Sequence, residues 1–294
     1  MLLIADSGST KTEWALIVSS EKVLETWSAG LNPNYVSRKI IYSEIKNSLH
    51  KFFIKEDEIR VGSLLSFAIN PDMVKKIFFY GSGCGTEKNK LIITDVLKEI
   101  YSKALISVNT DLQGAARALF KNDEGIACIL GTGSNSCYYR DGNIVKSVPS
   151  AGYILGDEGS GCYQGKKLLA AWLKDSLPVE IKKLFDEEFN LSRQQIIEKI
   201  YKEPQANRFF ASFSPFLYKN IKHEFVYNLI KEAFDIFIRE YVMRYDNFRV
   251  LKVGFVGSVA YHFSELLEKS LIDAEIINYK ILRYPIQELV NYHQ

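Results

Sequence analysis

The sequence predicts an α/β protein of two lobes that share one order of elements, βββαβαβα. A turn rich in glycine and serine follows an apolar strand at three places, near residues 7, 131 and 257. The order of strands and helices also repeats, and the second copy contains a long helical insertion. Because two of the turns lead into another strand and the third leads into a helix, we expect a nucleotide cleft between the lobes.

The first half of the chain reads as a three-stranded meander followed by alternating helices and strands. Ile41, Ile45 and Leu49 recur at helical spacing, and Thr86 is a helix start. The expected elements are strands 2–6, 13–18 and 22–28, helix 39–53, strand 76–80, helix 86–101, strand 105–109 and helix 112–120. The segment Ile59 to Met73 fits either a strand or a packed connection.

The second half begins the same order again. Its expected elements are strands 125–130, 137–140 and 143–148, a helical insertion over about 160–245, strand 252–256, helix 261–271, strand 275–282 and helix 286–292. We therefore expect an N-terminal lobe over 1–113, joined by the C-terminal helix 284–294, and a C-terminal lobe over 114–283.

Composition limits the classes of function. With 294 residues, 47% hydrophobic and 24% charged, the chain is long enough for two cores. The net charge of +2 and the mixing of lysines with acids favour neither nucleic-acid nor membrane binding. No apolar run reaches the roughly 18 residues that span a bilayer, and the chain starts with a strand rather than a signal segment. The expected location is the cytoplasm.

The turns carry the residue types that hold phosphate. Convergent backbone N–H groups bind phosphate oxygens, hydroxyls and a lysine add donors, and small residues allow close approach. The expected ATP phosphate ligands are Ser7, Gly8, Ser9, Thr10, Lys11 and Thr12 in the first turn and Gly131, Thr132, Gly133 and Ser134 in the second. The third turn, Gly257 and Ser258, would contact adenosine. Asp6 supplies a hard oxygen ligand suited to Mg²⁺.

The turns do not match the other common phosphate-binding motifs. The chain contains neither a GxxxxGK[ST] string nor a G-x-G-x-x-G string, so a P-loop and a dinucleotide fold are not indicated. A single Gly/Ser turn is usually only a hairpin. Three such turns in the expected order favour nucleotide binding.

Five motifs occur in order between about Ile4 and Ala260: DSGSTKTEW, NTDLQGAARAL, LGTGSNS, GYILGDEGSG and VGFVGSVA. Together they resemble the N-acetylglucosamine kinase and BadF/BadG-type ATPase family, within the larger actin, sugar-kinase and heat-shock-chaperone ATPase fold. The resemblance implies two ribonuclease-H-like lobes with the active site between them. It also implies ATP-dependent phosphorylation of an amino sugar, most directly N-acetylglucosamine, or else an ATP-driven activator with an iron–sulfur cluster. Ser7 and Ser9 stand where the family more often has glycine.

The motifs favour the kinase. Sugar phosphorylation needs a carboxylate that accepts the hydroxyl proton, and Asp111 stands where the family's kinases place their catalytic base, although it also suits a helix N-cap. Asn34, Asn135, Gly152 and Asp157 resemble the family's sugar-binding positions. Turn formation around Pro33 and helix capping by Asp157 are the alternatives.

Two further functions stay open. An activator of a 2-hydroxyacyl-CoA dehydratase or benzoyl-CoA reductase system needs paired, exposed cysteines for its cluster. The four cysteines form no CxxC pair, and of Cys84, Cys128, Cys137 and Cys162 only Cys84 has an exposed context. A non-catalytic sugar or nucleotide sensor is the other candidate, but a sensor needs no base such as Asp111.

The aromatic run RFFASFSPFLY suggests a contact between two copies of the chain in a homodimer. The same residues would alternatively lie in the core.

Overall fold

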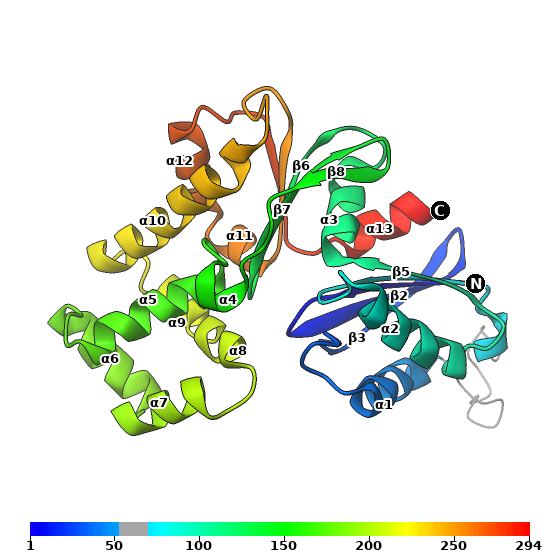
Figure 1. Cartoon of the computed structure of the whole chain (residues 1–294), viewed down its shortest axis with the longest axis horizontal. Helices are drawn as coiled ribbons and strands as arrows, with labels where there is room; N and C mark the ends of the chain where they lie inside the picture. The colour runs from blue at the N-terminus through cyan, green and yellow to red at the C-terminus, as the bar shows by residue number, and fades with distance from the viewer. Residues whose placement is uncertain (53–69) are drawn as a thin grey trace. The chain divides into compact units, whose positions relative to one another are not determined.

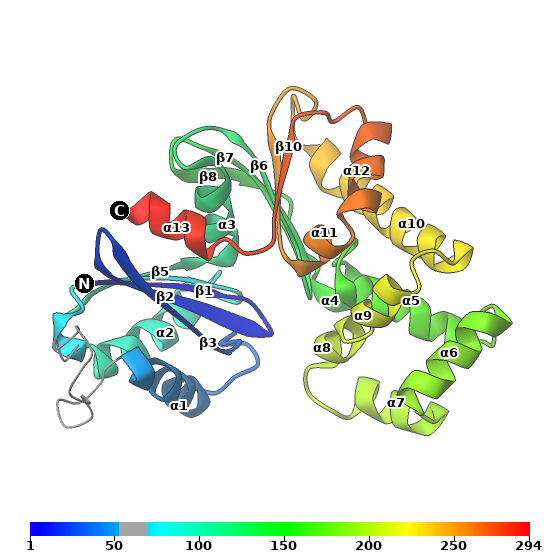
Figure 2. The same cartoon turned by 180° about the vertical axis from the view of Figure 1, so that it is seen from behind.

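The computed structural model describes residues 1–52 and 70–294 (Figures 1 and 2). Most of the segment 59–73 therefore lies outside the described residues, and its end, Pro71–Met73, is a 3₁₀ turn (η3). The chain forms two compact units, residues 1–118 with 285–294 and residues 119–284.

The first unit contains a mixed five-stranded sheet in the order β3-β2-β1-β4-β5. The first three strands form an antiparallel meander, and β4 and β5 run parallel to β1. The elements are β1 (Leu2–Ser7), β2 (Lys11–Ser19), β3 (Lys22–Ala29), α1 (Arg38–Leu49), η1 (His50–Phe52), β4 (Lys76–Gly81), α2 (Glu87–Ile100), β5 (Leu105–Thr110), α3 (Asp111–Phe120) and α13 (Ile286–His293).

Alternation along β1 sends side chains to the two faces of this sheet. On one face, α1 and α2 cover a core that includes Leu3 and Trp14. On the other, α13 and the end of α3 cover Ile4, Ala15 and Tyr80. Asp6 follows Ile4 on this second face, so the fold places its carboxylate just beyond the apolar layer.

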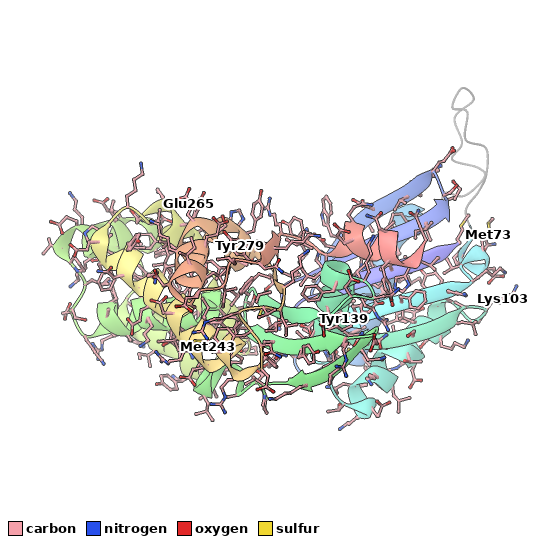
Figure 3. The ribbon with its side chains drawn as sticks, turned by 90° about the horizontal axis from the view of Figure 1, so that it is seen from above. Met73, Lys103, Tyr139, Met243, Glu265 and Tyr279 are labelled. Carbon is pink, nitrogen blue, oxygen red and sulfur yellow. The ribbon has the colours of Figure 1, made fainter. Side chains whose placement is uncertain are left out.

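The second unit repeats the sheet, because its strand order β8-β7-β6-β9-β10 matches that of the first. This match confirms the predicted α/β duplication. The strands are β6 (Gly125–Leu130), β7 (Ser134–Arg140), β8 (Asn143–Ser147), β9 (Val253–Val256) and β10 (Tyr279–Leu282). Tyr139 on β7 and Tyr279 on β10 are labelled in Figure 3.

Helices occupy the long connection between β8 and β9. They are α4 (Gly152–Leu155), α5 (Gly161–Leu173), α6 (Val179–Phe189), α7 (Arg193–Tyr201), α8 (Ala206–Ala211), α9 (Ser214–Lys219), α10 (Glu224–Glu240) and η4 (Val242–Arg244). Phe210, Phe213 and Phe216 are buried in the core that these helices share with the sheet. Because the three rings come from the run that suggested a homodimer contact, that run gives no support for a dimer.

Two sequence boundaries are corrected near the end of the second unit. The predicted strand 275–282 begins only at Tyr279, because Glu275 has a left-handed φ of 60° and the Ile276 amide bonds back to the Leu271 carbonyl. The predicted helix 261–271 is divided into α11 (Ser258–His262) and α12 (Ser264–Asp273). In the described part of the chain, no helix is long and apolar enough to cross a membrane.

Candidate active site

The first candidate phosphate site is the β1–β2 hairpin. A hydrogen bond of 2.9 Å from the Gly8 amide to the Lys11 carbonyl closes its turn. None of residues 7–12 has a positive φ, so the turn does not require glycine at any of these positions. The backbone therefore accepts serine at positions 7 and 9. Gly8 and Ser9 are half-buried and Thr10 is exposed, so these residues form the accessible tip.

The hydroxyls of Ser7 and Thr12 point into the protein rather than toward this tip. Both side chains are buried, and their oxygens lie 2.8 Å apart. Since Thr12 donates to the Ala29 carbonyl, the Ser7 hydroxyl donates to Thr12 and accepts from the Leu31 amide. The two hydroxyls join β1 and β2 to the chain that follows β3, so the Thr12 hydroxyl, which was expected to donate to phosphate, is already hydrogen-bonded inside the protein.

Gly30, the residue after β3, packs against the same hairpin. The sequence analysis did not identify this contact. Its amide donates to the Thr10 carbonyl at 2.9 Å. A Cβ on Gly30 would lie 2.3 Å from the Ser9 carbonyl oxygen and 2.6 Å from that of Gly8. Only glycine allows the chain after β3 to pack this closely on the hairpin.

Three carboxylates gather beside the hairpin. Burial, together with the nearby Glu13 and Asp111, raises the pKa of Asp6 to about 8, and Lys11 opposes this shift. Burial also raises the pKa of Asp111 to about 6, although backbone amides, including that of Leu112, lower it. Glu13 stands directly opposite Asp6 in the antiparallel pair. Burial thus disfavours the charged forms of Asp6 and Asp111, and a divalent cation would suit this environment because it favours ionised carboxylates.

Glu13 is a residue that the sequence analysis missed. One of its oxygens accepts from the Lys11 ammonium at 2.8 Å. The other, Oε2, is buried and accepts no hydrogen bond from the described residues. The Lys11 ammonium also lies 4.8 Å from the ring centroid of Trp27, an exposed side chain on β3. Lys11 is thus held between a carboxylate and an aromatic ring.

Asp111 is the first residue of α3 rather than its N-cap. The cap is Thr110, whose hydroxyl accepts from the Gln113 amide at 3.2 Å. The Asp111 carboxylate accepts from the adjacent Leu112 amide at 2.9 Å. The capping role considered for Asp111 therefore belongs to Thr110, and the Asp111 carboxylate lies just after the end of β5.

In the second unit, helix α5 holds the β6–β7 hairpin. The amides of Gly161 and Cys162 donate to the carbonyls of Gly131 and Thr132 at 2.9 and 3.1 Å. The hairpin itself is closed by a bond of 3.0 Å from the Gly131 amide to the Gly133 carbonyl. The first turn of α5 thus fixes the carbonyl side of this predicted phosphate turn.

Asp157 supports that hairpin as well. Its Oδ1 accepts from the Ser134 amide at 3.3 Å, and a Cβ on Gly133 would lie 2.9 Å from its Oδ2. Burial raises the pKa of Asp157, while the Ser134 amide and Lys166 lower it. Because Ser160 caps α5, capping does not explain Asp157. The structure places this predicted sugar ligand against the phosphate turn.

The third turn packs directly on the second hairpin. Gly257 has a φ of 129°, and a Cβ on it would lie 2.3 Å from the Leu130 carbonyl oxygen. Ser258 then begins α11. Glycine is required here by protein packing, which differs from the predicted reason, an open approach for adenosine.

The other predicted sugar ligands lie apart along the chain. Asn34 is exposed, and its Oδ1 accepts from Asn89 at 2.8 Å. Asn135 on β7 is half-buried and accepts from the next amide. Gly152 has a φ of 67° and begins α4, with open space where a Cβ would stand. The sequence did not identify Asn89, which holds Asn34 in the first unit.

All four cysteines are buried and unpaired, including Cys84, whose predicted exposure is wrong. Burial raises the pKa of Cys84 to about 12, so its thiol stays protonated at neutral pH. Within residues 1–52 and 70–294, no group of three His, Cys, Asp or Glu side chains is arranged to hold a metal. Buried thiols do not suit a cluster shared at a surface between two subunits.

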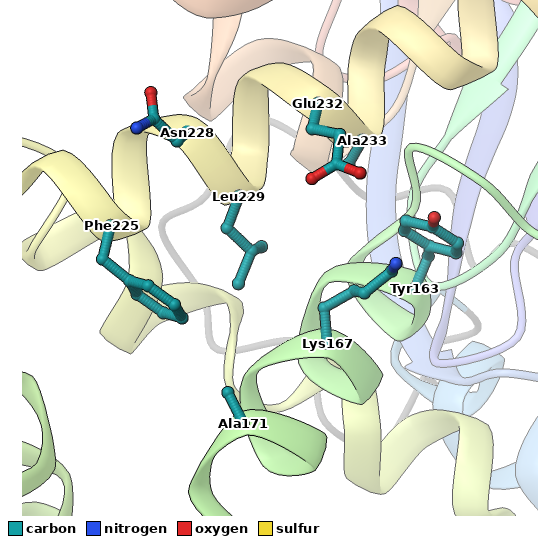
Figure 4. A pocket seen from close by; sticks show the side chains of 8 residues that line it. All are labelled: Tyr163, Lys167, Ala171, Phe225, Asn228, Leu229, Glu232 and Ala233. Atoms are coloured by element: carbon teal, nitrogen blue, oxygen red, sulfur yellow. The ribbon is translucent and has the colours of Figure 1, made fainter. Parts of the chain in front are cut away.

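The second unit has two surface hollows. Figure 4 shows one of about 270 Å³ between α5 and α10, lined by Tyr163, Lys167, Phe225 and Glu232 among others. The other, of about 400 Å³, is lined by Glu158 and Tyr241 among others. Neither is lined by a residue predicted to bind or react, so the carboxylates and hairpin of the first unit and the hairpin of the second unit, each considered by itself, remain the candidates.

Solved structures similar to this chain bear on its family. A solved structure from Porphyromonas gingivalis, described as a candidate N-acetylglucosamine kinase, is 36% identical and superposes with a TM-score of 0.87 over 100% of this chain and 98% of that one. A second candidate N-acetylglucosamine kinase, from Chromobacterium violaceum, superposes with a TM-score of 0.72 over 100% of this chain and 98% of that one. At 16% identity it shows the fold alone.

A curated relative gives a shorter match. The N-acetylmuramic acid/N-acetylglucosamine kinase of Clostridium acetobutylicum is 31% identical over 172 residues, which is 58% of this chain and 52% of that protein. The match therefore spans about half the length of this relative. No family model matches the sequence. The full-length match to the Porphyromonas gingivalis protein shows that the chain belongs to the N-acetylglucosamine kinase family of sugar kinases.

Proposed function

We propose that this protein is an ATP-dependent kinase that phosphorylates an amino sugar, most directly N-acetylglucosamine. The observation that carries the proposal is the pair of carboxylates, Asp6 and Asp111, beside an accessible hairpin, in a chain of this family. Gly8, Ser9, Thr10 and Lys11 would bind phosphate in the first unit. Gly131, Thr132, Gly133 and Ser134 would do so in the second, with Gly257 and Ser258 near adenosine.

Asp111 would act as the general base. With a pKa of about 6, its carboxylate is ionised at neutral pH but is more basic than an ordinary aspartate. It would accept the proton of the sugar hydroxyl as the oxygen attacks the γ-phosphate. Asn34, Asn135 and Gly152 would orient the sugar, and Asp157 would hold the second hairpin in position.

The residues present also fit Mg²⁺. Two observations support this fit. Asp6 is half-buried and its pKa is raised to about 8, and Oε2 of the neighbouring Glu13 is buried without a hydrogen-bond partner among the described residues. Mg²⁺ commonly binds one or two carboxylates together with substrate phosphates, so a full protein cage is not needed. When bound, the ion would neutralise phosphate charge. Asp6 would hold it, directly or through water.

The substrate is tested with a panel of sugars. N-acetylglucosamine, N-acetylmuramic acid, glucosamine, N-acetylmannosamine and glucose are each incubated with ATP and Mg²⁺, and ADP release is measured. We expect the highest kcat/KM for an N-acetylated sugar, with phosphate on the 6-hydroxyl by NMR. If no sugar raises ADP release above the sugar-free rate, the proposal is wrong.

Binding of Mg-ATP should release protons near pH 7. Asp6 has a pKa of about 8, so it is largely protonated there, and a cation bound to its carboxylate displaces the proton. Calorimetry in two buffers of different ionisation enthalpy should give a release approaching about one proton. Asp6→Asn should abolish most of it, whereas an unchanged release would contradict the metal role of Asp6.

The same groups set the direction of the stability change with pH. Because the folded pKa values of Asp6 and Asp111 lie above the ordinary 3.8, the folded protein binds more protons than the unfolded chain. The free energy of unfolding should therefore fall as pH rises from about 4 to 8. Thermal unfolding across this range, with Asp6→Asn as the variant that flattens the curve, measures the effect.

A further inference from the structure

The contacts of Tyr80 are not explained by the proposed chemistry. This fully buried residue lies near the end of β4, where its Cα neighbours across the sheet are Asp6 on β1 and Asn109 on β5. It shares the face of the sheet that carries Asp6. Asn109 stands two positions before Asp111. Tyr80 is thus directly between the strands that present the two carboxylates.

Helix α3 packs on the ring of Tyr80. A Cβ on Gly114 would lie 2.8 Å from both Cβ and Cγ of Tyr80, so the helix backbone contacts the ring with no side chain between them. Gly114 follows Asp111 by three residues, which is about one helical turn. The height of this turn above the sheet is therefore set by Tyr80.

Two side chains bind the hydroxyl of Tyr80. Arg117 of α3 donates to it at 2.9 Å, and Nε2 of His293 in α13 lies 2.7 Å away. The ring of His293 also stacks on Phe78, with centroids 3.8 Å apart. Figures 1 and 2 both show α3 and α13 side by side over the sheet. Tyr80 therefore links both helices to β4.

The direction of these hydrogen bonds follows from charge. Arginine only donates, so the Tyr80 oxygen accepts from Arg117. Burial and the nearby Arg117 lower the pKa of His293 to about 4, so its imidazole is neutral at physiological pH. Tyr80 consequently donates its proton to Nε2 of His293, so its hydroxyl both accepts from Arg117 and donates to His293.

We propose that Tyr80 is a positioning residue of the kinase, which fixes the first turn of α3 and thereby the carboxylate of Asp111 relative to Asp6. The inference rests on the proposed function, because it assigns Asp111 as the base. Its mechanism is geometric: Gly114 contacts the ring, while Arg117 and His293 prevent the ring and the two helices from shifting.

The first test is Tyr80→Phe, which keeps the ring under Gly114 and removes the hydroxyl. We expect kcat for N-acetylglucosamine phosphorylation to fall roughly 10- to 100-fold, because a small displacement of a catalytic group has effects of this size. The KM values for ATP and sugar should stay within about twofold, because the fully buried Tyr80 is not exposed for contact with a substrate. Tyr139→Phe is the matched control, since Tyr139 is a buried tyrosine of the other sheet whose hydroxyl donates to the Lys121 carbonyl.

The decisive test is a double-mutant cycle with Asp111→Asn, read by transfer of labelled γ-phosphate. If Tyr80 acts through Asp111, Tyr80→Phe should lower the rate little in the Asp111→Asn background. An equal loss in both backgrounds would show a general structural effect and overturn the proposal. His293→Phe, which retains an aromatic ring against Phe78, is the second variant and should lower kcat in the same direction.

The outcomes separate this inference from the proposed function. An active wild type whose kcat is unchanged by Tyr80→Phe and by His293→Phe overturns the role of Tyr80 alone. A wild type that binds ATP but phosphorylates no sugar overturns the kinase assignment, and the role of Tyr80 with it.

Discussion

Asp111→Asn should lower kcat for sugar phosphorylation by roughly 10²- to 10⁴-fold, the usual contribution of a positioned general base. Asparagine retains the shape of the side chain but does not accept the hydroxyl proton. The wild-type kcat should decline as pH falls through about 6, where Asp111 takes up a proton. This acid limb should be absent from the residual activity of the variant.

The structure makes this substitution easy to interpret. Thr110, and not Asp111, caps helix α3, so the variant should keep its fold and its affinity for ATP. Above pH 6, removing the partly buried charge of Asp111 should stabilise the protein, because burial disfavours the charged form of this side chain. Calorimetry with a non-hydrolysable ATP analogue and thermal unfolding check both expectations.

Thr110→Ala is the matched variant for the helix end. It removes the cap and should cost about 1 kcal/mol of stability, with a far smaller loss of kcat than Asp111→Asn. If Asp111→Asn instead turns over at the wild-type rate, with chemistry shown to be rate-limiting, Asp111 is not the base.

The sequence predicted the order of elements because apolar periodicity and turn residues are local signals. The strands of both sheets and the start of α2 at Thr86 follow from such signals. The position of Asp111 at the end of a strand followed as well. The strand 275–282 was predicted too long because its apolar residues continue through a left-handed turn at Glu275, which apolar periodicity does not reveal.

The candidate site was harder to predict because its contacts join residues distant in sequence. Ser7 and Thr12 looked like phosphate ligands by residue type, yet they hydrogen-bond each other inside the sheet. Glu13 is opposite Asp6 only in the antiparallel register. A clear signal for Glu13 was nevertheless present, since a hairpin centred on Gly8 to Lys11 pairs these two positions.

Gly257→Ala should have a large effect on stability, a loss of roughly 3 kcal/mol or more. The residue combines a φ of 129° with a ψ of 161°, a region in which only glycine is common. Its new Cβ would also lie 2.3 Å from the Leu130 carbonyl oxygen and 2.8 Å from the carbonyl carbon. Backbone atoms at the end of β6 have little freedom to move aside.

The measurement is thermal unfolding, in which a loss of this size should lower Tm by about 6–12 °C. Gly131→Ala is the matched control for stability, because a Cβ there meets nothing within 4 Å and Gly131 has no positive φ.

The two variants, Gly257→Ala and Gly131→Ala, also distinguish two roles of the third turn. If Gly257→Ala keeps its Tm but loses ATP affinity, Gly257 serves mainly to admit adenosine. If Tm falls, and ATP binds to the folded fraction with near wild-type affinity, Gly257 serves mainly to pack the turn on the second hairpin, as the contact with Leu130 indicates.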